Sequence, residues 1–252
     1  WAKIMRERFG AKDPKSWMLR FHTQTAGVQL TAQQPEVNMV RVAVQGLAAA
    51  LGGTQSLHTN SFDEAMALPS EKAARLALRT QQVLAFETDI CETVDPFAGS
   101  YVIESLTDDI ETAATALIAR IDDMGGAVAA IEQGFQKAEI ERSAYDIALQ
   151  IDSGTRVVVG LNKFTTDDKE HYPPLRVNPA IEAEQSARLA TLRAGRDNGE
   201  VERLLAVIRE TAKGDSNLLY PMRDALKALA TVGEVSDALR DVWGLFEPTD
   251  RF

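Results

Sequence analysis

Apolar residues along the chain form long stretches with helical spacing, separated by shorter apolar runs that have the length of strands. The clearest helical pattern follows Pro35, where apolar residues recur three or four positions apart as far as Gly52-Gly53. These residues are Val37, Val40, Val44, Leu47 and Leu51. A second helix is predicted from Ser70, a good N-cap residue, to Phe86.

The second half of the sequence predicts more helices. Thr107 is a candidate N-cap for a helix that ends at Gly125-Gly126, and two further helices are expected over 127–133 and 136–151. A polar, proline-bearing linker follows, and from Ile181 onward alanine- and leucine-rich stripes predict a helical region.

Three short runs predict strands, over 15–25, 54–58 and 156–162. The third run is β-branched and continuous, which is typical of a strand buried on both faces of a sheet. Long helical crossovers separate the runs, as parallel strands require, so the chain is predicted to be α/β. Three strands cannot close an eight-stranded barrel. The residues therefore leave open either a small open sheet or one part of a larger barrel.

Two polar, glycine-flanked segments occupy the ends of the first two predicted strands, at 20–27 and 52–60. The carboxyl ends of parallel strands form the edge at which α/β proteins bind ligands. We therefore expect the uncharged polar groups of these segments to lie on one rim. The residues are His22, Gln24, His58 and Asn60.

Composition narrows the classes of function. The formal net charge of −10 and the pI near 4.9 argue against nucleic acid or an anionic membrane as partners. No apolar run has the length of a membrane span, and no signal peptide opens the sequence, which begins at Trp1 and is expected to lack its own start. The single cysteine, Cys91, excludes an internal disulfide and predicts a cytoplasmic location, and it is expected to be a small buried or loop residue.

Four separated motifs carry a resemblance to a known family. They are Arg20–Gly27, Gly53–Asn60, Asp95–Tyr101 and Val159–Phe164. Their residues and their order resemble the large, substrate-binding chain of methylmalonyl-CoA mutase and of related acyl-CoA mutases, from Lys15 to about Trp243. The resemblance implies that 1–164 are the last strands and helices of a (β/α)8 TIM barrel. It implies that 165–252 are a linker and a mainly helical C-terminal region.

The resemblance also implies an adenosylcobalamin cofactor and the radical rearrangement of the carbon skeleton of an acyl-CoA. By motif, Gln24 and Gly27 match positions that contact the cofactor beside the first strand end. Asn60 and Glu64 match positions that hold the adenosine ribose, and Ala67 matches one on the corrin side. His22 is expected to line the active cavity, so His22 and Glu64 are the catalytic candidates.

Several residues have simpler interpretations. Turn chemistry and helix capping are the alternatives for Gln24, Asn60 and Glu64. His58 is predicted to have a structural hydrogen-bonding role, while Lys163 is expected near the rim and without function. The other polar candidates are expected to be solvated rather than metal-binding: Asp108, Asp109 and Glu111 at a helix start, and His171 in the linker.

No metal ligand is predicted. The family's lower cobalt ligand is a histidine in an Asp-x-His-x-x-Gly motif, and neither His22, His58 nor His171 stands in such a motif. The ligand is therefore expected from another domain or chain. The early barrel strands, which bind coenzyme A, are also expected from a remaining barrel segment. The implied partners are an acyl-CoA substrate, a cobalamin-binding domain or subunit, and a second large chain in a dimer.

The predicted function is thus one part of a mutase, most simply the one that interconverts methylmalonyl-CoA and succinyl-CoA. Mutases for isobutyryl-CoA or 2-hydroxyisobutyryl-CoA are alternatives, and so is a homologous large chain that has lost catalysis and serves as a structural partner. A small open-sheet nucleotide-binding protein would need a glycine-rich phosphate loop, and the sequence has no G-x-G-x-x-G or Walker pattern.

Overall fold

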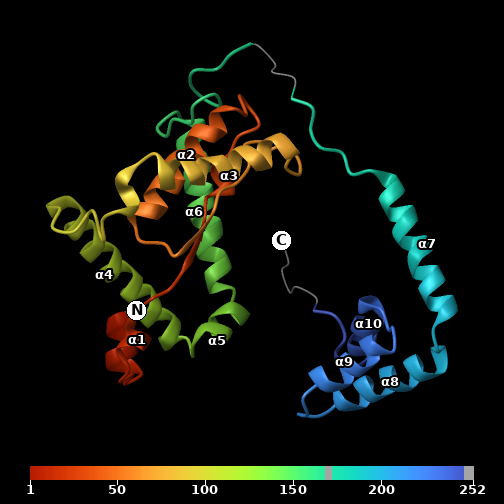
Figure 1. The fold of residues 1–252 in the computed structure, drawn as a ribbon. Helices are drawn as coiled ribbons and strands as arrows, with labels where there is room; N and C mark the ends of the chain where they lie inside the picture. Colours follow the sequence, from red (N-terminus) through yellow and green to blue (C-terminus); the bar gives the residue numbers. More distant parts are fainter. Residues whose placement is uncertain (168–171, 247–252) are drawn as a thin grey trace. The chain divides into compact units, whose positions relative to one another are not determined.

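The computed structural model describes residues 1–167 and 172–246 (Figure 1). It is an α/β structure in which helices dominate, and two short strands form the sheet of the described residues. The chain divides into two compact units, Trp1–Arg176 and Val177–Phe252. The division into a barrel part over 1–164 and a tail over 165–252 stays a prediction. Within the described ranges, no helix is both long and apolar enough to cross a membrane.

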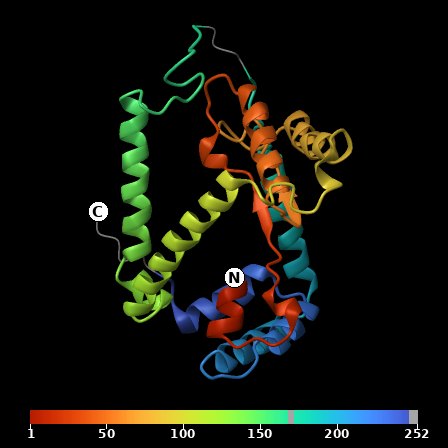
Figure 2. The same cartoon turned by 90° about the vertical axis from the view of Figure 1, so that its left-hand side faces the viewer.

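The elements of the first unit follow in chain order. They are the π-helical turn η1 (Ile4–Arg8), α1 (Pro14–Trp17), β1 (His22–Gln24), the 3-10 turn η2 (Gly27–Gln29), α2 (Val37–Leu51), β2 (Ser56–His58), α3 (Glu71–Phe86), the 3-10 turn η3 (Asp89–Cys91), α4 (Tyr101–Asp123), α5 (Ala127–Glu132) and α6 (Phe135–Asp152). Two views related by a 90° turn show α4 and α6 diverging from the short α5 (Figures 1 and 2).

The sheet consists of β1 and β2, which run parallel. His22 lies beside Ser56, and Gln24 lies beside His58. Successive side chains of a strand point to opposite faces, so these four share one face, and all four are exposed. The strand predicted over 54–58 is confirmed as β2 in a shorter form.

The helices predicted after Pro35 and from Ser70 are confirmed as α2 and α3, and the structure packs them together beside the sheet. Gly46 is buried in α2, and a Cβ there would lie 3.1 Å from Leu84 Cδ1 and 3.8 Å from Leu57 Cδ2. The missing side chain lets α2 approach both β2 and α3. The helix consequently buries the Asn38, Val42 and Gly46 face.

Two predicted strands need correction. The strand expected over 15–25 is limited to β1, because Asp13 caps α1 by accepting a hydrogen bond from Lys15 N at 2.9 Å. The strand expected over 156–162 is a turn-rich loop whose valines are partly exposed, including Val157 at 46% and Val159 at 42%. Asn162 takes up the backbone groups that a ladder would use, since its side chain accepts from Val158 N and donates to the carbonyl oxygens of Ile151 and Arg156, each at 2.8 Å.

The predicted cap at Thr107 is also wrong. Helix α4 begins at Tyr101, and the Thr107 hydroxyl donates to Ile103 O at 2.7 Å within the helix. The acidic cluster therefore lies inside α4 rather than at its start, although its members are exposed, and no group of metal-ligating residues occurs among the described residues. The predicted end at Gly125-Gly126 is confirmed, since both glycines have positive φ, of 100° and 97°.

The second unit is helical, as predicted from Ile181 onward. Its elements are α7 (Pro179–Gly195), α8 (Asn198–Thr211), α9 (Leu219–Lys227) and α10 (Val232–Trp243). Helices α8, α9 and α10 share one apolar core. The core residues are Val201, Leu205, Ile208, Ala225, Ala230, Val235 and Ala238.

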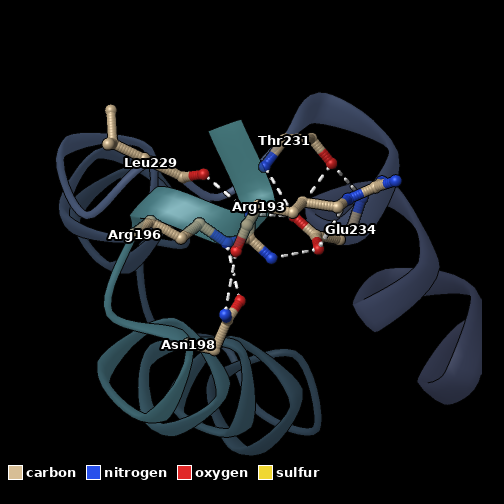
Figure 3. Close-up of polar contacts among 6 residues, drawn as sticks. All are labelled: Arg193, Arg196, Asn198, Leu229, Thr231 and Glu234. Carbon is tan, nitrogen blue, oxygen red and sulfur yellow. Dashed lines mark hydrogen bonds and ion pairs between the residues drawn. The ribbon is translucent and has the colours of Figure 1, made fainter. Parts of the chain in front are cut away.

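A capping box begins α10, and an arginine from the α7–α8 corner closes over it (Figure 3). Glu234 accepts from Thr231 N at 2.8 Å, and the Arg196 guanidinium donates to both Glu234 carboxylate oxygens, at 2.8 and 2.5 Å. Arg196 also donates to Leu229 O at 2.8 Å, and only 5% of its side chain is exposed. The hydrogen bonds from Arg196 and Thr231 lower the pKa of Glu234 to about 2.

Glu234→Gln retains a side chain that can complete the capping box but removes the charge paired with Arg196. We expect it to lower the free energy of unfolding by about 2 kcal/mol at neutral pH. The folded-state pKa of Glu234 is depressed from 4.5 to about 2. Its contribution is therefore fully present above about pH 4.5 and is lost as the pH falls through about 2. Urea unfolding followed by Trp243 fluorescence, with Trp1 and Trp17 changed to Phe, measures the difference.

The control is Glu210→Gln, because Glu210 pairs with Lys213 on the surface, with side chains 73% and 59% exposed. Its cost should stay below about 1 kcal/mol. Equal losses in the two variants, or a loss at Glu234 that does not shrink in acid, would contradict the assigned role of the ion pair.

Candidate functional site

The two predicted polar segments meet at the carboxyl ends of β1 and β2. Thr25 N donates to His58 O at 3.0 Å, which continues the parallel pairing beyond the strands. Side chains then join the loops, because the Thr25 hydroxyl donates to Asn60 Oδ1 at 2.7 Å and accepts from Asn60 N at 2.9 Å. Thr25 and Asn60 are 5% and 4% exposed. The convergence expected for these segments is therefore confirmed.

Asn60 in turn holds Glu64. Its Nδ2 donates to Glu64 Oε2 at 2.6 Å, and Ser61 N donates to Oε1 at 2.7 Å. Glu64 N donates to Ser61 O at 3.2 Å, so the carboxylate and the backbone close one turn. Glu64 is half-buried and forms no ion pair with the described residues. Each carboxylate oxygen accepts one hydrogen bond from the chain and has a further lone pair to offer.

Gly27 lies against this network. A Cβ at residue 27 would lie 3.0 Å from Asn60 Nδ2, closer than a side-chain neighbour tolerates without shifting. The absence of a side chain at Gly27 thus leaves space for the Asn60 amide at the strand ends.

Helix α2 supplies the polar groups that satisfy both loops. Gln45 accepts from Ala26 N at 2.8 Å, after β1. Asn38, which is fully buried, donates to Thr31 O and to Phe62 O, both at 2.9 Å, and so joins the loop after β1 to the loop after β2. Gln45 and Asn38 lie between the apolar residues that predicted this helix, and neither belongs to one of the four motifs. A polar residue on the buried face of a helix is the signal that identifies such a group.

Asp63 is a second buried acid of the turn and is 1% exposed. Its Oδ2 accepts from Ser70 N at 3.0 Å and from the Tyr172 hydroxyl at 3.2 Å. None of the sequence patterns assigned a role to Asp63, and Tyr172 belongs to the predicted linker. No sequence signal connects two residues this far apart.

The other candidates lie on the exposed strand face or away from the site. His22 Nδ1 is 2.7 Å from Ser56 Oγ, and Gln24 and His58 lie on the same face. Ala67 is half-buried in the loop, where its N–H donates to Asp63 O at 3.1 Å.

Lys163 and Cys91 contribute nothing to this geometry. Lys163 lies over the ring of Phe164, 5.3 Å from its centroid. Cys91 is exposed at the end of η3, which fits the predicted loop position. His171 lies outside the described residues.

The carboxyl ends of parallel strands are the edge at which α/β proteins bind ligands, and here this edge carries amide and carboxylate groups. Comparison with known proteins places the chain in a family. The sequence model of the family described as methylmalonyl-CoA mutase matches residues 1–245, and the chain belongs to that family. The resemblance drawn from the four motifs is confirmed.

The relatives include enzymes with different substrates in their names. The chain is 42% identical over 252 residues to the probable mitochondrial methylmalonyl-CoA mutase of Caenorhabditis elegans, and 47% identical over 232 residues to the methylmalonyl-CoA mutase of Escherichia coli. It is 41% identical over 254 residues to the 2-hydroxyisobutanoyl-CoA mutase large subunit of Aquincola tertiaricarbonis. These matches cover 100%, 92% and 100% of this chain and 34%, 32% and 45% of the relatives. The chain thus spans about a third of the two methylmalonyl-CoA mutases and less than half of the large subunit.

Gly27→Ala tests the packing at the strand ends. We expect it to lower the free energy of unfolding by about 1–3 kcal/mol, because the new methyl group displaces the Asn60 amide. The loss should be smaller when Asn60 is already Ser, since the crowded Nδ2 is then absent. Urea unfolding of the four chains of this cycle, followed by Trp17 fluorescence with Trp1 and Trp243 changed to Phe, gives the coupling energy. A coupling energy near zero would show that residues 27 and 60 do not crowd each other.

Proposed function

We propose that the chain is part of an adenosylcobalamin-dependent acyl-CoA mutase, an isomerase that rearranges a carbon skeleton by radical chemistry. The observation that carries the proposal is the Asn60–Glu64 arrangement at the ends of two adjacent parallel strands. It provides a half-buried carboxylate, without an ion pair among the described residues, on the edge where this fold class binds ligands. Membership of the family supports the same reading.

We further propose that β1 and β2 are two of the eight strands of a TIM barrel completed by a remaining segment. The support is that the chain spans only about a third of the mutases it matches. A second support is the amount of apolar surface left uncovered on α4, where Val102 is 66% and Ile110 is 68% exposed. In a barrel, the exposed face of β1 and β2 lines the interior, which would place His22 and Gln24 in the active cavity.

Each candidate residue has a role in this proposal. Glu64 accepts hydrogen bonds from the ribose hydroxyls, and Asn60, which is almost fully buried, holds the Glu64 carboxylate in position. Gln24 and Gly27 contact the cofactor beside the end of β1. Ala67 lies on the corrin side, where a small side chain leaves space for a flat ring system.

The residues present fit a ribose-bearing group. A neutral diol needs acceptors, and Glu64 offers two carboxylate oxygens that each retain acceptor capacity. When bound, adenosylcobalamin supplies a carbon-centred radical by cleavage of its cobalt–carbon bond. This chain would bind and orient the adenosyl end and keep water out. The lower ligand to cobalt comes from another domain or chain.

The substrate is an acyl-CoA. Methylmalonyl-CoA and succinyl-CoA are proposed because the relatives from Caenorhabditis elegans and Escherichia coli are named methylmalonyl-CoA mutases. A 2-hydroxyisobutyryl-CoA or isobutyryl-CoA substrate is the alternative, and one relative is named a 2-hydroxyisobutanoyl-CoA mutase large subunit. The proposed partners are a cobalamin-binding domain or subunit, the remaining barrel segment and a second large chain. A cytoplasmic location is proposed from the cysteine content.

One observation favours a second candidate function. The contacts of Glu64 with Asn60 and Ser61 are also those of a turn-closing residue. In a homologous large chain that has lost catalysis and serves as the structural partner in a heterodimer, Glu64 would only need to close this turn.

The first prediction of the proposal concerns the chain by itself. We expect no mutase turnover from residues 1–252 supplied with adenosylcobalamin and an acyl-CoA, because the coenzyme A site and the lower cobalt ligand lie elsewhere. Following the isomerisation of methylmalonyl-CoA by chromatography measures this. Turnover above the protein-free rate would contradict the proposal that the barrel is completed by another segment.

The second prediction concerns Glu64 in the complete enzyme. Glu64→Gln retains an acceptor for Ser61 N but loses the negative charge and the oxygen that accepts from Asn60 Nδ2, and we expect the KM for adenosylcobalamin to rise at least about tenfold. Glu64→Ala should in addition slow turnover or increase the loss of radical to side reactions. The control is Glu71→Gln, an exposed acid in the first turn of α3, which should change neither quantity. Normal kinetics in both Glu64 variants would favour the structural-partner function.

A further inference from the structure

Tyr172 is distant in sequence from the strand ends but contacts the turn that carries Glu64. Its hydroxyl donates to Asp63 Oδ2 at 3.2 Å and lies 2.5 Å from Ser70 Oγ. Its ring meets the ring of Phe62 nearly edge-on, with centroids 5.1 Å apart and an interplanar angle of 72°. One side chain thus makes polar and aromatic contacts with both ends of the segment 62–70.

The polar contact falls on a carboxylate with few partners. Asp63 is 1% exposed, and its Oδ1 has no hydrogen-bond partner among the described residues. Both donors, Ser70 N and the Tyr172 hydroxyl, meet the other oxygen. A buried carboxylate is costly when its hydrogen bonds are lost. The Tyr172 hydroxyl therefore stabilises the position of Asp63 more than a surface contact would.

Movement of Asp63 would be transmitted directly to the site. Asp63 precedes Glu64 in the chain, and its carbonyl oxygen accepts from Met66 N at 2.9 Å and from Ala67 N at 3.1 Å. Its side chain and its backbone thus organise the turn on both sides of Glu64. The Glu64 carboxylate stays in place through the 2.6 Å contact with Asn60, which requires the turn to keep its geometry.

We propose that Tyr172 is a positioning residue, which fixes the Asp63 carboxylate and thereby holds the turn that aims Glu64 at its ligand. The inference rests on the proposed function, because it assigns the ligand of Glu64 to the adenosyl ribose. The proposal also gives a role to the start of the described segment 172–178, which precedes α7, because Tyr172 helps to hold the Glu64 turn.

The test compares Tyr172→Phe with Tyr172→Ala in the complete enzyme. Phe keeps the ring against Phe62 and removes only the hydroxyl, whereas Ala removes both. The control is Tyr145→Phe, which deletes a hydroxyl from a tyrosine of α6 that is 65% exposed. Backbone amide hydrogen exchange without cofactor is measured for peptides over 59–70 and over α2, and the KM for adenosylcobalamin and kcat are measured for each variant.

We expect Tyr172→Phe to speed exchange over 59–70 by about three- to tenfold, with α2 unchanged, because one hydrogen bond to a buried carboxylate is lost. The KM for adenosylcobalamin should rise by about the same factor with little change in kcat, and Tyr172→Ala should have the larger effects. The control should change neither quantity.

Two results would overturn the proposal. Exchange over 59–70 that is unchanged in Tyr172→Phe would mean that the hydroxyl does not hold the turn. Faster exchange with an unchanged KM would mean that the contact is structural only. Glu64→Gln, measured in parallel, separates this failure from that of the proposed function: if it also leaves the KM unchanged, the ribose assignment itself is wrong.

Discussion

Buried polar side chains, rather than a long strand ladder, hold the two strand ends together. Strands β1 and β2 contain three residues each, and a pair this short has little stability by itself. The loops that follow the strands are partly buried, so their backbone N–H and C=O groups need hydrogen-bond partners within the protein. Thr25 and Asn60 satisfy each other across the pair, and Asn38 reaches both loops from α2. The position of every candidate site residue after the strands depends on these contacts.

These hydrogen bonds to the loops explain why polar residues occur on the buried face of α2, where apolar residues would otherwise be expected. Asn38 lies on the buried face of α2 with Val42 and Gly46. A leucine at residue 38 would bury more apolar surface but would leave Phe62 O and Thr31 O without this donor. Gly46 gives up side-chain packing so that Leu57 and Leu84 can approach the helix. Asn38 and Gly46 both lower the intrinsic stability of α2, and both help to fix the positions of the strand ends.

The sequence predicted those features of the site that depend on local chemistry. The helix after Pro35, the cap at Ser70, the strand at 54–58 and the convergence of two polar segments follow from spacing, capping and the parallel topology. The predicted strand at 156–162 was wrong because composition does not reveal that one side chain, Asn162, takes the place of a neighbouring strand. The cap at Thr107 was wrong because a threonine inside a helix can bond to the carbonyl four residues earlier.

The contacts of Glu64 can serve a turn and a ligand at the same time. Within the turn, Ser61 N donates to Oε1 and Asn60 Nδ2 donates to Oε2, so the turn uses both side-chain oxygens, whereas a glutamine offers only one acceptor. Each carboxylate oxygen keeps a further lone pair, and Glu64 forms no ion pair with the described residues. Ribose hydroxyls are donors that fit this remaining acceptor capacity. The free lone pairs of a half-buried carboxylate, rather than its hydrogen bonds within the turn, are therefore the strongest physical argument for a ligand at the strand ends.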